Sequence, residues 1–138
     1  MRQAQTVLTI ATHGAGLVEI TDETARWLAA QGIATGLLTV FCRHTSASLL
    51  INENAAPAVR RDLERYFARL APESRDYEHD DEGPDDMPAH LKTALTAVSL
   101  SIPVADARMV LGTWQGVYLF EHRAAPHRRQ VVLHLIGE

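Results

Sequence analysis

The segment HDDEGPDDMPAHLK, from His79 to Lys92, contains five acidic residues, two histidines and the only lysine of the chain. A solvated loop that leads into a helix would account for the acidic residues, but not for a histidine at each end. Asp86 and His90 are four residues apart, so a helix would place them on one face, where the carboxylate can accept the spare imidazole N–H. Histidine and carboxylate side chains are common zinc ligands, and the segment is therefore a candidate metal site.

A further candidate ligand is His44 in the stretch FCRHTS, which follows a run rich in β-branched and apolar residues. In a strand, Cys42 and His44 share one face. The simpler interpretation is a hydrogen-bonded histidine at a strand end. Together with His79 and His90, however, His44 would complete a three-histidine site for zinc or a similar divalent ion, with one position open to water or a substrate oxygen.

The stretch TWQGVYLFEHR places another histidine, His122, at the end of an apolar strand. Strand alternation puts it on the same face as Trp114, Tyr118 and Phe120. Aromatic residues in this pattern more often form a core than a ligand platform, and we expect these in the core. An imidazole at the end of such a face can titrate near neutrality. His122 is therefore a candidate general acid or base, and Asp86 is the second candidate catalytic residue.

Three other residues are candidate substrate contacts. Gln115 and Arg123 alternate onto the face of the strand opposite His122. Lys92 lies two residues beyond His90 and faces away from it on an ideal helix, so it would reach a phosphate only if a neighbouring subunit closed over that face. Arg123 and Lys92 could stabilise negative charge on a phosphorylated substrate.

Length and composition predict one domain, residues 1–138, with a single core. The net charge of -4 disfavours a nucleic-acid binder, because phosphate binding rests on clustered Lys and Arg. The single cysteine, Cys42, excludes an intrachain disulfide and a Cys-rich zinc cluster. The first residues lack the pattern of a secretory leader, and no apolar run approaches the ~20 residues of a membrane span, so we expect a soluble, cytoplasmic protein.

Hydrophobic periodicity and turn residues predict three helices and about seven strands. The helices are expected over residues 21–32, 55–72 and 85–99. The main strands are expected over residues 5–12, 34–54 with a break near 44–46, 99–104, 108–112, 113–123 and 129–138, the last two joined as a hairpin. Such partly segregated elements predict an α+β fold, a sandwich-like domain built on an antiparallel or mixed sheet.

Four blocks carry a resemblance to a known family. HTSASLLINENA, HDDEGPDDMPAHLK, SLSIPV and GTWQGVYLFEHR, in this order and near these spacings, resemble the YjbQ-type family, whose members are often labelled secondary thiamine-phosphate synthase. The resemblance covers practically the whole chain, and the GTWQ block with its EHR ending is specific. Leu50 stands where threonine is common in the family, which is a small departure on an expected strand.

The resemblance implies a compact α+β subunit that assembles as a homotrimer. It also implies a divalent metal site built from histidines that correspond to His44, His79 and His90. The implied activity joins a hydroxymethylpyrimidine diphosphate to a thiazole phosphate, releasing pyrophosphate and forming thiamine phosphate. The chain has no Gly-rich phosphate loop and only one lysine, so we interpret this activity as weak or secondary to the use of another small phosphorylated substrate. The alternative is a non-catalytic trimeric protein that binds a ligand or supports assembly and has a structural metal.

Overall fold

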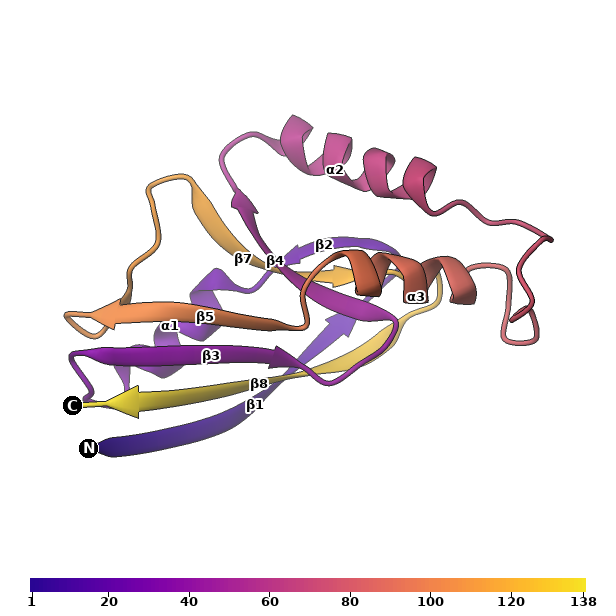
Figure 1. The fold of residues 1–138 in the computed structure, drawn as a ribbon. Helices are drawn as coiled ribbons and strands as arrows, with labels where there is room; N and C mark the ends of the chain where they lie inside the picture. Colours follow the sequence, from indigo (N-terminus) through magenta and orange to yellow (C-terminus); the bar gives the residue numbers. More distant parts are fainter.

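The structure is a computed structural model that describes residues 1–138, with eight strands and three helices. The strands are β1 (Arg2–Thr12), β2 (Gly16–Glu19), β3 (Gly36–Cys42), β4 (Ala47–Glu53), β5 (Ser99–Ala105), β6 (Arg108–Met109), β7 (Gln115–Glu121) and β8 (His127–Gly137). The helices are α1 (Thr21–Ala29), α2 (Pro57–Leu70) and α3 (Asp86–Leu95). Together they form a single α+β domain built on two antiparallel sheets (Figure 1).

The larger sheet joins strands from both ends of the chain. Its order is β1-β8-β3-β5-β6, while the smaller sheet has the order β2-β7-β4. The strands β1 and β8 pair over eleven positions, from Arg2 opposite Gly137 to Thr12 opposite His127. The two termini therefore lie side by side at one end of the strands (Figure 1).

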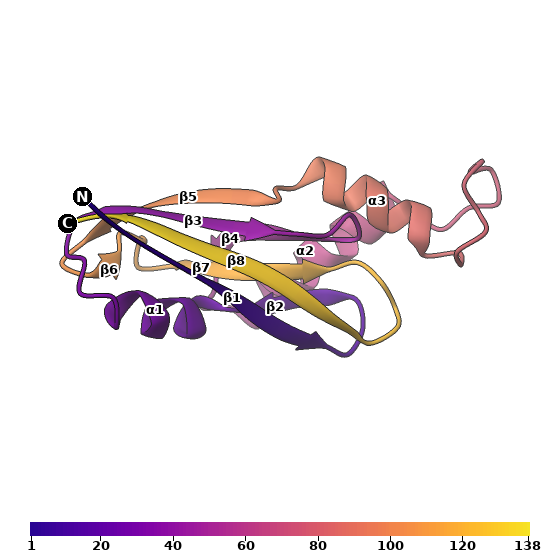
Figure 2. The same cartoon turned by 90° about the horizontal axis from the view of Figure 1, so that it is seen from below.

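The opposite end of the strands gathers the connections that carry most of the histidines. Here β1 turns into β2, β3 into β4 and β7 into β8, and the loop before α3 projects beyond them (Figure 2). We call this the loop end of the molecule. Six of the seven histidines lie in or beside these connections or on α3: His13, His44, His79, His90, His122 and His127.

The core lies between the two sheets, because strand alternation turns one apolar face of each sheet inward. Leu38 on β3, Leu119 on β7 and Leu133 on β8 are fully buried members of it. Burial of each such side chain contributes roughly 1.5–3 kcal/mol of transfer free energy. A smaller cluster lies under α2, where Phe67 packs edge-on against Phe120 with ring centroids 5.4 Å apart.

The helices pack against selected strands and so determine where the functional residues lie. α1 contacts β6 and β7, α2 contacts β2, and α3 contacts β4.

The outer face of the larger sheet is left partly apolar and open to solvent: Val7 and Phe41 are each 43% exposed and Leu37 is 41% exposed. No helix has the length and apolar character needed to cross a membrane.

The predicted α+β architecture with three helices is confirmed, but the predicted hairpin of the last two strands is wrong, because β7 and β8 belong to different sheets. The break predicted within residues 34–54 separates β3 from β4, which belong to different sheets. Trp114, which we expected in the core, lies just before β7 and is 64% exposed. The strand predicted over 108–112 is only the two-residue β6, because the chain leaves the sheet after Met109.

Candidate functional site

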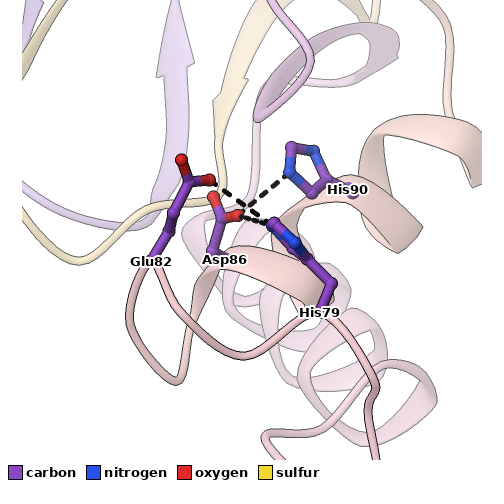
Figure 3. A group of neighbouring side chains, drawn as sticks. All are labelled: His79, Glu82, Asp86 and His90. Carbon is purple, nitrogen blue, oxygen red and sulfur yellow. Dashed lines mark hydrogen bonds and ion pairs between the residues drawn. The ribbon is translucent and has the colours of Figure 1, made fainter.

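The first turn of α3 and the loop before it bring four potential metal ligands together. Asp86 is the first residue of the helix and is only 2% exposed, and His90 follows one turn later. His79 and Glu82 come from the preceding loop. The ligand atoms of these four side chains all lie within 4.8 Å of one another, and Figure 3 shows them converging. We call His79, Glu82, Asp86 and His90 the α3 site.

One carboxylate oxygen, Oδ2 of Asp86, is the centre of the α3 site. It lies 2.7 Å from Nε2 of His79 and 3.1 Å from Nε2 of His90. The same nitrogen of His79 is 3.4 Å from Oε2 of Glu82. This arrangement agrees with the prediction that Asp86 and His90 lie on one face of a helix, next to His79.

The hydrogen bonds of His90 determine where its protons lie. Its Nδ1 is 2.8 Å from the backbone carbonyl of Thr45. A carbonyl oxygen only accepts hydrogen bonds, so Nδ1 carries a proton. In a neutral ring, Nε2 then presents a lone pair toward the Asp86 carboxylate, which also offers only lone pairs. Two facing acceptors require a cation between them, either a proton on the ring or a bound metal ion.

Arg123 holds the carboxylates of Asp85 and Asp86 in place through hydrogen bonds. Its Nε donates to Oδ2 of Asp85 at 3.1 Å, and its Nη1 donates to Oδ1 of Asp86 at 2.6 Å. Its Nη2 donates to the carbonyl of Glu82 at 2.9 Å. All three guanidinium nitrogens are thus engaged. Arg123 therefore orients the α3 site, and its role as a substrate contact stays a prediction.

The electrostatics of the α3 site favour an ionised Asp86. Burial alone would raise the pKa of this carboxyl, but hydrogen bonds with His79 and Glu82, and the charges of His90 and Arg123, lower it below its usual value. The hydrogen bond with Asp86 in turn raises the pKa of His79. The ionised carboxylate is the form that can bind a cation.

A surface cleft opens beside the α3 site. Its volume is about 680 Å³, and its lining includes His79, Tyr77 and Met87, with the acidic side chains of the same loop. Ligand pockets for small molecules commonly have roughly 300–1,000 Å³. A small substrate can therefore reach one face of the site from this side.

His44, predicted as the third histidine ligand, lies outside this group. Its Nε2 accepts a hydrogen bond from the backbone N–H of Gln130 on β8 at 2.7 Å. The connection between β3 and β4 directs the side chain of His44 to β8, while the carbonyl of the next residue, Thr45, faces His90. Within one chain, the structure brings together two of the three predicted histidines, with Asp86 and Glu82 as the other potential ligands.

His122 is buried, which overturns the expectation that it titrates near neutrality. It is 2% exposed, its ring packs on Phe120, and its Nε2 lies 2.8 Å from Oγ of Ser48. Burial and, to a smaller extent, the charge of Lys92 lower the pKa of His122 to about 3. The ring is therefore neutral at physiological pH and is not placed to exchange protons with a ligand in the cleft.

The two remaining predicted substrate contacts lie in different places. Lys92 is on α3, where burial lowers its pKa although Glu73 and Asp85 oppose that effect. Gln115 begins β7, at the end of the strand away from Glu121, and its Oε1 accepts a hydrogen bond from the N–H of Gly112 at 2.8 Å. In this chain Gln115 closes a turn and does not meet the α3 site.

Glu82 is a member of the site that the sequence did not reveal. The acidic residues of the loop could all be explained as solvated surface groups. No local pattern distinguishes Glu82 from Asp80 or Asp81. Its position three residues after His79 and four before Asp86 was the one available signal. That spacing carries information only once the loop is known to fold back onto α3.

Comparisons with known proteins place the chain in a family. A family model described as UPF0047 protein YjbQ-like matches residues 6–138. The chain belongs to the YjbQ family. The UPF0047 protein sll1880 of Synechocystis is 52% identical over 138 residues, covering 99% of this chain and 94% of that relative. The YjbQ protein of Salmonella typhimurium is 45% identical over 135 residues, covering 97% of this chain and 98% of that protein.

Solved structures of YjbQ-like proteins share the fold. The crystal structure of the conserved hypothetical protein TT1486 from Thermus thermophilus is 36% identical, with a TM-score of 0.84 over 95% of this chain and 99% of that one. A YjbQ/UPF0047 protein from Clostridium acetobutylicum is 32% identical, with a TM-score of 0.83 over 96% and 99%. The names of these relatives give the family and no activity.

Buried His122 makes the stability of this YjbQ-family protein depend on pH. Its pKa is about 3 in the folded protein, against a reference value of 6.5, so between these values the unfolded chain binds one more proton. The free energy of unfolding is therefore expected to fall by about 1.4 kcal/mol per pH unit as the pH drops through this range. We expect His122→Gln to remove that slope in urea unfolding measured from about pH 7 to about pH 4.

A matched variant separates this effect from general weakening of the fold. Leu119→Ala truncates a fully buried side chain with no ionisable group. It is expected to lower the free energy of unfolding by about 2–5 kcal/mol at every pH and to keep the wild-type slope. A His122→Gln protein that retained the wild-type slope would show that the ring is not the group responsible.

Proposed function

We propose that this protein is a metal-dependent enzyme acting on a small phosphorylated substrate, with the α3 site as its metal centre. The observation that carries the proposal is the approach of Nε2 of His90 to Oδ2 of Asp86 at 3.1 Å, because the two lone pairs need a cation between them, either a ring proton or a metal ion. A divalent ion between them would satisfy both lone pairs. His79 and Glu82 supply two further donor atoms within reach.

The donor set of the α3 site fits zinc. Imidazole nitrogen and carboxylate oxygen bind zinc at about 2.0–2.2 Å, so the ligand atoms of a tetrahedral site are roughly 3.5 Å apart. The present atoms, all within 4.8 Å, need only small side-chain movements to reach that spacing. The carbonyl of Thr45 and the guanidinium of Arg123 orient His90 and Asp86 as outer partners do in metal sites. A bound ion would supply Lewis-acid stabilisation of charge on phosphoryl oxygens.

The reaction to assay first is the one that the family resemblance implies. In it the bond between the pyrimidine methylene carbon and the diphosphate oxygen breaks, and pyrophosphate leaves with the bonding electrons. The ring nitrogen of the thiazole phosphate donates its lone pair to form the new carbon–nitrogen bond. This nitrogen carries no proton, so the step needs no general base, which is compatible with the burial of His122. We propose this coupling as a secondary activity beside the use of another small phosphorylated substrate.

A non-catalytic role has one observation in its favour. Two of the α3-site residues, His79 and Glu82, come from a surface loop, and the other two come from a helix. A metal held by all four would tie the loop to α3 and could serve stability or ligand binding alone. Turnover and stability measurements on the same metal-loaded protein distinguish this alternative from catalysis.

We also propose that the protein self-associates as a homotrimer, as the family resemblance implies. The uncovered face of the larger sheet supports an assembly surface. Alternation along β1 and β3 leaves Val7, Leu37 and Phe41 directed outward and more than 40% exposed. Neighbouring apolar side chains of this kind on a sheet face commonly mark a protein interface.

Metal content is the first expected result. Protein purified without a histidine tag or chelator is expected to contain about one zinc or similar ion per chain by elemental analysis. His90→Ala and Asp86→Asn should each lose the metal, because each removes one of the two facing acceptors. His44→Ala should keep it, since that side chain bonds β8 and not the α3 site.

His134→Ala is the matched control for removal of an imidazole. His134 lies on β8 and its Nε2 is 2.9 Å from Oε1 of Gln3, away from the loop end. Full metal content in His134→Ala and loss in His90→Ala would assign the metal to the α3 site. A wild-type protein that takes up no stoichiometric metal even after zinc is added would overturn the proposal.

The rate of turnover is expected to depend on the bound metal. Zinc-loaded wild type should release pyrophosphate from hydroxymethylpyrimidine diphosphate in the presence of thiazole phosphate. His90→Ala is expected to lower the rate by at least about a hundredfold while the protein remains folded by circular dichroism. Undiminished turnover by metal-free protein would contradict the metal-dependent mechanism. Stoichiometric metal without turnover above a metal-only control would favour the structural role.

The trimer has its own test. Light scattering coupled to size-exclusion chromatography is expected to give three times the chain mass of 15.2 kDa. Phe41→Asp should lower that mass, because a carboxylate buried in a subunit interface without a partner is strongly unfavourable. Arg65→Asp on the solvated face of α2 is the control and should leave the mass unchanged. A monomeric wild type at assay concentrations would contradict the proposal.

A further inference from the structure

A buried ion pair between Arg129 and Glu121 lies at the loop end. Nε of Arg129 donates to Oε1 of Glu121 at 2.8 Å, and Nη2 donates to Oε2 at 2.5 Å. Glu121 also accepts hydrogen bonds from the hydroxyl of Thr12 and from the backbone N–H groups of His122 and Arg123. The negative charge is therefore fully compensated, and the carboxylate needs nothing further from Arg129.

The third nitrogen of this guanidinium is free. Nη2 of Arg129 additionally donates to the carbonyl and hydroxyl of Ser46, but Nη1 makes no hydrogen bond to the protein. The side chain is only 6% exposed. Only two buried side-chain polar atoms lack a hydrogen-bond partner, Oγ1 of Thr93 and Nδ1 of His122. Nη1 of Arg129 also lacks a partner but is not one of these buried atoms, so it reaches solvent. A nearly buried arginine thus presents two unused N–H donors at the loop end.

Two histidines lie near this guanidinium: the charge of Arg129 acts on His44, and His127 lies beside the carboxylate that Arg129 binds. Each has a ring nitrogen without a protein partner. The backbone N–H of Gln130 donates to Nε2 of His44, so in the neutral ring Nδ1 carries the proton and has no protein partner. Nδ1 of His127 donates to the carbonyl of Ala125 at 2.7 Å, which leaves Nε2 free. Nδ1 of His127 is 3.9 Å from the same carboxylate oxygen of Glu121 that Arg129 binds.

We propose that Arg129, His44 and His127 form a binding site for a phosphoryl group; we call these three residues the Arg129 site. Nη1 of Arg129 and Nδ1 of His44 donate to phosphoryl oxygens. Nε2 of His127 accepts the hydrogen of a monoprotonated phosphate. Arginine suits this role because its charge is permanent and its donors are held in place by the Glu121 pair.

The Arg129 site adjoins the α3 site through two connections. Thr45, which holds His90 by its carbonyl, lies between His44 and Ser46 in the chain. Arg123, which holds Asp86 by its side chain, donates its backbone N–H to Glu121. The inference deepens the proposed function, on which it rests for the identity of the substrate. It says that the phosphoryl group binds at the Arg129 site and the reacting part of the molecule near the α3 site.

The test uses inorganic phosphate and metal-free protein, so it does not depend on the metal. Chelator-treated full-length protein is titrated with phosphate by calorimetry and by phosphorus NMR. We expect wild type to bind with a Kd on the order of 1 mM. His44→Gln and His127→Gln should each raise the Kd by about tenfold, and Arg129→Lys should do so while keeping the charge beside Glu121, because lysine lacks the donor that Nη1 supplies.

Two controls decide where the phosphate binds. His134→Gln removes an imidazole on the opposite part of β8 and should leave the Kd unchanged. His79→Gln should also leave it unchanged, because the side chain of His79 contacts only the α3 site and its own loop. Loss of binding in His79→Gln with full binding in His44→Gln would place the anion at the α3 site and overturn the inference. Absence of phosphate binding by folded wild type would also overturn it, whereas failure of the proposed metal centre would appear in the elemental analysis.

Discussion

Arg123 joins the end of β7 to the first turn of α3, and the geometry of the α3 site depends on that junction. Its guanidinium contacts Asp85, Asp86 and the carbonyl of Glu82. A buried carboxylate without such a partner would cost several kcal/mol and would become protonated instead. The arginine therefore allows Asp86 to remain ionised at 2% exposure, and the ionised oxygen is what draws His79 and His90 together.

Three consecutive residues at the end of β7 serve three different parts of the molecule. Glu121 turns into the space between the sheets and pairs with Arg129. His122 points to the other face and bonds Ser48, and Arg123 continues past the strand to α3. Strand alternation produces this division without any special backbone geometry. It also means that a shift of β7 by one residue would break two ion pairs at once, Glu121 with Arg129 and Arg123 with Asp86. The register of this strand is therefore strongly specified.

The sequence was informative where function follows from local periodicity. The spacing of Asp86 and His90 predicted their shared helical face, and alternation predicted the common face of Phe120 and His122. It could not show the depth at which His122 is buried, because that depends on how α2 and α3 cover the smaller sheet. It also could not show that His44 turns toward β8. That outcome is set where the chain passes from one sheet to the other, which is a non-local choice.

The pairing of β1 with β8 has a consequence for the newly made protein. β1 has no other strand partner, so its eleven residues wait for residues 127–137 before the larger sheet can close. During translation, the apolar side chains of Val7, Leu8 and Ile10 therefore emerge well before their partner strand and remain unpaired until β8 has left the ribosome. Such late closure between distant segments slows folding and leaves an exposed strand edge in the meantime.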